Sequence, residues 1–90
     1  MKIQESAENY LETILILGKK TEGVHAIDIA GELGYSKPSV SIAMKRLREN
    51  GYIEIDEFQH ITLTARGREI AERMDERHRL LREQIGRAHV

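Results

Sequence analysis

Apolar side chains recur every three or four residues in two stretches near the start of the chain. Over residues 6–20 this spacing predicts an amphipathic helix with Ser6 as its cap. Over residues 26–33 it predicts a second, short helix. Gly34 is expected to end this helix, because glycine readily adopts the left-handed conformation found at helix C-termini. Residues 19–23 lack periodicity, so a loop is expected to join the two helices.

A third helix is predicted from the next apolar stripe. Ser36 is expected to cap it, with Pro38 in the first turn, where the missing amide proton of proline costs nothing. The helix is expected to stop near Asn50. The side chains that face the core are predicted to be Val40, Ala43, Met44 and Leu47.

Strand-like alternation then replaces helical spacing. Residues 53–55 and 61–63 alternate apolar and polar side chains around the polar stretch 56–60, which predicts a short hairpin with a loose tip. Thr64 is expected to cap a last helix, rich in Arg and Glu at separations that favour salt bridges. This order predicts a mainly α fold, a winged helix-turn-helix with three helices, a short β-hairpin wing and a C-terminal linking helix.

Length and composition exclude several classes of protein. A chain of 90 residues suffices for one small domain with one core. It has no cysteine, which excludes a disulfide framework and a thiolate metal site. No apolar run approaches the ~20 residues that cross a bilayer, so we expect a soluble, cytoplasmic protein. The net charge of −1 means that any nucleic-acid-binding surface must come from a local arrangement of charges.

The third predicted helix carries such a local basic surface. Residues 36–48 contain four basic residues and no acidic residue, which suits phosphate contacts. A short helix, a tight turn and this helix form the unit that places a recognition helix in the major groove. Ile42 lies on the polar face, where it either contacts a thymine methyl group or is simply a partly buried rim residue. The predicted DNA-contacting residues are Ser36, Lys37, Pro38, Ser39, Ser41, Ile42, Lys45 and Arg46.

The predicted wing is less suited to DNA. Asp56 and Glu57 at its tip would repel phosphates, so we expect the hairpin mainly to cover the core, with His60 as at most one phosphate contact. An alternative function is therefore a winged helix that contacts protein without specific DNA binding. An enzyme is not expected, because neither a glycine-rich phosphate-binding loop nor a His, Ser and Asp set is evident.

Several segments together resemble one family, the bacterial metal-dependent repressors related to the diphtheria toxin repressor and the manganese-transport regulators. These segments are SAENYLETI at 6–14, DIA at 28–30, YSKPSVS at 35–41, ITLT at 61–64 and RHRLL at 77–81. The likeness runs from about Glu5 to Leu81. It implies a homodimeric transcription repressor that binds Mn²⁺ or Fe²⁺ and then a palindromic operator in double-stranded DNA.

The resemblance also implies a partial metal site at Asn9, Glu12 and His78. Residues three apart on a helix share a face, so Asn9 and Glu12 can offer oxygens to one ion, and His78 adds a nitrogen. Asn9 departs from both branches of the family, which usually have aspartate or methionine here, and a neutral amide binds a hard cation more weakly. Without the resemblance, all three residues would be interpreted as polar side chains facing solvent.

The family's chain continues into a helical dimerisation region that supplies further metal ligands. We expect a DNA-binding domain over residues 1–64 and the start of a linking and dimerisation helix over 65–84. Residues 85–90 break the amphipathic pattern and do not resemble the family, so we predict a non-native tail there. The expected function is thus a metal-dependent repressor truncated after its DNA-binding domain.

Overall fold

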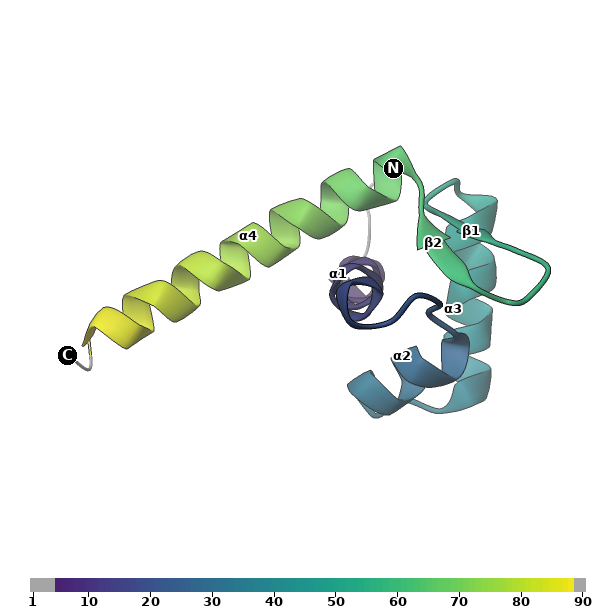
Figure 1. Cartoon of the computed structure of the whole chain (residues 1–90), viewed down its shortest axis with the longest axis horizontal. Coiled ribbons are helices and arrows are strands. Elements are labelled where there is room, and N and C mark those ends of the chain that lie inside the picture. Colours follow the sequence, from purple (N-terminus) through teal and green to yellow (C-terminus); the bar gives the residue numbers. More distant parts are fainter. Residues whose placement is uncertain (1–4, 89–90) are drawn as a thin grey trace.

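The fold is the winged helix-turn-helix that the order of patterns predicts. The computed structural model describes the backbone of residues 5–88 and the side chains of residues 6–81. Its elements are α1 (Glu5–Lys20), α2 (Ala26–Leu33), α3 (Lys37–Glu49), β1 (Ile53–Ile55), β2 (Ile61–Leu63) and α4 (Ala65–Ala88). Figure 1 shows α4 extending away from α3 and the wing, with α1 between them. No helix within the described residues is long and apolar enough to cross a membrane.

One core joins the helices to the wing. Its largest fully buried side chains come from four different elements: Leu11 from α1, Ile29 from α2, Val40 from α3 and Ile53 from β1. Burying an aliphatic side chain of this size contributes about 1.5–3 kcal/mol, so each element is held mainly by its apolar face. On α3, Met44 and Leu47 complete the predicted buried stripe, which leaves the opposite face of the helix free.

Local capping sets the boundaries of α2, α3 and α4. Gly34 adopts a φ of 71° after α2, as the helix-ending position requires. The Ser36 hydroxyl accepts a hydrogen bond from the Ser39 amide at 3.3 Å at the start of α3. The Thr64 hydroxyl accepts one from the Gly67 amide at 3.3 Å at the start of α4. All three caps are confirmed at the residues that the sequence predicts.

The wing is an antiparallel hairpin in which Ile53 lies opposite Leu63 and Ile55 lies opposite Ile61. Its tip is not the loose loop that the sequence suggests. The Asp56 carboxylate accepts hydrogen bonds from the backbone amides of Phe58, at 2.9 Å, and His60, at 2.8 Å. This side chain therefore folds the tip into a defined turn, which the polar composition of the stretch does not reveal.

The first turn of α4 lies unusually close to the backbone of Tyr52, the residue before β1. A Cβ atom at position 67 would lie 2.0 Å from the carbonyl oxygen of Tyr52, so only glycine fits there. The α4 backbone then continues as helix to Ala88. It includes residues 85–88 of the predicted tail, whereas residues 89–90 lie outside the described residues. The domain boundaries at 64 and 84 stay predictions.

Candidate nucleic-acid interface and metal site

The turn between α2 and α3 places α3 on the outside of the molecule, beside the wing (Figure 1). The Ala30 carbonyl at the end of α2 accepts hydrogen bonds from the amides of Gly34, at 2.9 Å, and Tyr35, at 3.1 Å. These bonds close the turn tightly, so that α3 starts two residues later, at Lys37. The orientation of α3 is therefore fixed by backbone bonds as well as by its buried stripe.

Every residue predicted to contact DNA is exposed in the structure. The set lies on the cap and outer face of α3 and comprises Ser36, Lys37, Pro38, Ser39, Ser41, Ile42, Lys45 and Arg46. Ile42 is 57% exposed, which is high for an isoleucine and leaves its side chain available to a ligand. The geometry thus brings these residues together on one surface that is small, polar and basic.

The cations of this surface are not neutralised by neighbouring acids. Lys37, Lys45 and Arg46 form no ion pair with any side chain that the structure describes. A cation without a protein partner can release counterions when it meets a phosphate, which is the main source of affinity for nucleic acid. Charge balance on α3 therefore favours an anionic ligand.

Two of the serines on this surface also serve the helix itself. The Ser36 hydroxyl donates a hydrogen bond to the Ser39 hydroxyl at 2.8 Å, in addition to accepting from the Ser39 amide. Both side chains are therefore held in place at the N-terminus of α3. Arg48 is a basic, exposed residue of the same helix that the predicted set omits, although the count of charges along residues 36–48 included it.

The structure brings together two of the three predicted metal ligands. The His78 Nδ1 atom of α4 lies 2.8 Å from the Glu12 Oε2 atom of α1, which is hydrogen-bonding distance. The Glu12 residue is 8% exposed, so its carboxylate is largely removed from solvent and needs this partner. The pair ties the N-terminal helix to the linking helix.

Asn9 lies on α1 one turn before Glu12 and is half-buried. No hydrogen bond links its side chain to Glu12 or His78 within the described part of the chain. Nor do three or more His, Cys, Asp or Glu side chains gather at metal-binding distances there. A buried carboxylate beside an imidazole is nevertheless an oxygen and nitrogen donor set that suits a divalent transition metal, so the residues present fit part of such a site.

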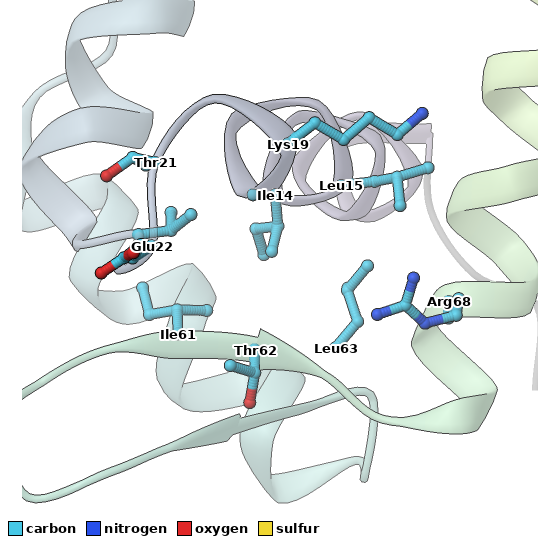
Figure 2. Close-up of a pocket in the computed structure, with 11 residues that line it drawn as sticks. Ile14, Leu15, Lys19, Thr21, Glu22, Ile61, Thr62, Leu63 and Arg68 are labelled. Carbon is cyan, nitrogen blue, oxygen red and sulfur yellow. The ribbon is translucent and has the colours of Figure 1, made fainter.

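A hollow of about 220 Å³ lies between α1, β2 and the start of α4 (Figure 2). Its walls include the apolar side chains of Ile14, Leu15 and Leu63, with Lys19 and Arg68 at the margin. None of the residues predicted to contact DNA or metal lines it, so this hollow is separate from both sites.

The sequence matches a family of DNA-binding domains. The profile described as "Iron dependent repressor, N-terminal DNA binding domain" matches residues 2–61. The transcriptional regulator MntR of Escherichia coli O6:H1 is 33% identical over 78 residues, which are 87% of this chain and 50% of that protein. MntR of Geobacillus kaustophilus is 33% identical over 84% of this chain and 54% of its own length. The chain thus spans about half the length of these curated relatives.

Solved structures support the fold. FabT of Streptococcus pneumoniae, crystallised with DNA, superposes with a TM-score of 0.73 at 24% identity, over 93% of this chain and 60% of FabT. The DNA complex of Staphylococcus aureus MepR gives 0.67 at 20% identity, over 92% of this chain and 62% of MepR. The matched relatives and neighbours are transcription regulators and not enzymes.

Proposed function

The chain belongs to the iron-dependent repressor family, matching its N-terminal DNA-binding domain, and we propose that it represses transcription by binding double-stranded DNA through α3. One observation carries this proposal. The outer face of α3 is exposed and basic, and its cations Lys37, Lys45 and Arg46 have no acidic partner among the described side chains.

In the proposed complex, the N-terminal part of α3 enters the major groove. Lys37, Lys45 and Arg46 contact phosphates or base edges, since both kinds of contact favour cationic donors. Ser36, Ser39 and Ser41 are short enough to let the helix backbone approach the duplex, and Pro38 fixes the first turn. Ile42 packs against a thymine methyl group.

We also propose that Asn9, Glu12 and His78 hold a divalent cation, Mn²⁺ or Fe²⁺. Support comes from the family and from the contact between Glu12 and His78 across α1 and α4. A bound divalent cation supplies positive charge to this buried carboxylate. The two residues also tie α4 to α1, so the contact that fits a metal helps to hold the linking helix against the domain.

The assembly proposed for the active repressor is a homodimer on a palindromic operator in the cytoplasm. Two recognition helices related by a two-fold axis reach half-sites about 34 Å apart, or a multiple of this spacing. A single copy contacts one half-site only, so its affinity for DNA is expected to be much lower than that of a dimer.

The DNA proposal is tested by fluorescence anisotropy of a labelled duplex at several salt concentrations. The variant Lys45→Ala/Arg46→Ala should weaken binding strongly and flatten its dependence on salt, because two phosphate-contacting charges are lost. Arg73→Ala/Arg77→Ala on the exposed face of α4 removes the same charge and serves as the matched control. Equal loss in both variants, or no duplex binding even at low salt, would favour a winged helix that contacts protein instead.

The metal proposal is tested by isothermal titration of Mn²⁺ into the chain. Glu12→Gln and His78→Gln should each lower the affinity for Mn²⁺ by about 10- to 100-fold or abolish binding, as loss of a metal ligand or of a residue that orients one does. Glu72→Gln, at an exposed position of α4, is the control and should leave the affinity unchanged. Unchanged Mn²⁺ affinity in the Glu12 and His78 variants would contradict this assignment.

A further inference from the structure

A groove of about 220 Å³ separates α3 from the wing. Its walls carry four polar side chains, which are Ser41, Lys45 and Arg48 from α3 and Gln59 from the wing, and its floor includes Met44 and Ile55. Positions 41, 45 and 48 are four and three residues apart and so share one face of the helix. The polar surface of α3 therefore continues from the predicted DNA-contacting residues towards the wing.

We propose that this groove binds one phosphate of the DNA backbone, between α3 and the wing. Arg48 and Lys45 would supply the positive charge, and the side-chain amide of Gln59 would donate a hydrogen bond from the opposite wall. This inference rests on the proposed function and adds two contacts, Arg48 and Gln59, to it. An arginine is well suited to this position, because its planar guanidinium group offers two parallel donors to a phosphate.

The electrostatics of the groove favour an anion. Lys45 and Arg48 are both exposed, and neither forms an ion pair with a described side chain. Among the side chains that the structure describes, no acidic one lines the groove. Two unpaired cations in a partly enclosed space raise the local potential more than the same charges on an open surface would.

The acidic residues of the wing tip lie outside the groove. Asp56 turns its carboxylate into the wing, where one oxygen accepts hydrogen bonds from the Phe58 and His60 amides and the other lies 3.3 Å from Nδ1 of His60. Neither Asp56 nor Glu57 lines the groove, whereas Gln59 does. The expectation that the wing tip repels DNA stays a prediction, while the groove beside α3 lies apart from the two acids.

The wing is also fixed in position before any ligand binds. The His60 ring packs edge-to-face on His25 at the start of α2, with 4.8 Å between the ring centroids. A Cβ atom at Gly23 would lie 2.6 Å from the same ring, so glycine allows His60 to sit there. The Ile61 amide donates to the Val24 carbonyl at 2.7 Å. A wing held in this way loses little conformational entropy when it closes on a phosphate.

The test compares single variants of the full chain in anisotropy titrations of a labelled mixed-sequence duplex. Arg48→Ala should weaken binding and lower the slope of log Kd against log salt by about one, as loss of one phosphate contact does. Arg48→Lys should have the same slope as the unaltered chain, because lysine keeps the positive charge. Gln59→Ala should weaken binding while leaving the slope unchanged, because the amide is neutral. Arg73→Ala removes the same charge from α4 and is the matched control.

Circular dichroism melts establish that each variant is folded, so that any loss of binding belongs to the groove. If Arg48→Ala behaves like Arg73→Ala while Lys45→Ala/Arg46→Ala still weakens binding, the groove does not bind a phosphate, although the proposed function stands. If the unaltered chain shows no salt-sensitive binding to duplex DNA, the phosphate-binding groove and the proposed function are both overturned.

Discussion

Single side chains at the wing and at the start of α4 set details of the fold that apolar patterns do not encode. Asp56 folds the wing tip by accepting two backbone amides, and Gly67 allows the start of α4 to approach Tyr52. Each acts through direct contact with the backbone rather than through burial of apolar surface. A conservative substitution at either position should therefore alter its backbone contact and leave the apolar core unchanged.

Gly67→Ala is expected to destabilise the domain. The new methyl group would lie 2.0 Å from the Tyr52 carbonyl oxygen, which forces a backbone shift that costs about 1–3 kcal/mol or more. Gly31→Ala is the control, because nothing lies within 4 Å of a Cβ atom there. It should instead raise the free energy of unfolding by about 0.5–1 kcal/mol, since alanine favours a helix interior. Urea denaturation measures the free energy of unfolding of both variants. Equal changes in Gly67→Ala and Gly31→Ala would contradict this explanation.

Asp56→Asn should change how stability depends on pH. The hydrogen bond from the His60 amide is the largest cause that holds the pKa of the Asp56 carboxyl below its usual value of 3.8. Desolvation opposes this effect, and the Phe58 amide and the His60 imidazole add to it. A folded-state pKa below the unfolded one means that the ionised group stabilises the fold above about pH 3.8, and that this contribution is lost as pH falls through the lowered pKa.

The difference in unfolding free energy between Asp56→Asn and the parent chain should therefore shrink between about pH 6 and about pH 3. Urea denaturation at these two pH values measures the change. Asparagine keeps an oxygen that can accept the two amides, so the tip itself should stay folded. A difference that stays constant with pH would show that the charge of Asp56 contributes nothing to stability.

At the scale of elements, the sequence predicts most of what the structure shows. The stripe of Val40, Ala43, Met44 and Leu47 predicts α3 and its buried face, because helical periodicity reports which side of a helix is covered. Ala43 is the one member that is only partly buried. The contact between Glu12 and His78 is different, since 66 positions separate the two residues and periodicity carries no information at that range. Only the family resemblance predicts that Glu12 and His78 belong to one site. The groove beside Arg48 likewise depends on how the wing packs.

The N-terminal cap of α3 should contribute measurably to the stability of the domain. Ser36→Ala should lower the free energy of unfolding by about 1 kcal/mol, because the Ser39 amide loses its acceptor at 3.3 Å. Ser41→Ala, on the exposed face of the same helix, should be nearly neutral. Thermal denaturation of the two variants makes the comparison. Equal stability of Ser36→Ala and Ser41→Ala would mean that the cap does not hold the helix start.

At the scale of the whole molecule, two sites lie on different parts of one small domain. α3, which carries the basic face, lies beside the wing (Figure 1). Glu12 and His78 join α1 to α4. α1 packs mainly against α4, and the Glu12–His78 contact joins the same two helices. In the account proposed here, the first site binds DNA, and the second positions the helix that leads away from the DNA-binding domain.

The most direct test of DNA binding through α3 is a titration of the ¹⁵N-labelled chain with duplex DNA, followed by amide chemical shifts. The largest shifts should fall on residues 36–48 and on the wing near Gln59, and the amides on the exposed face of α4 around Arg73 should change little. Shifts confined to α4 or spread evenly over the surface, or no shifts at low salt, would contradict DNA binding through α3.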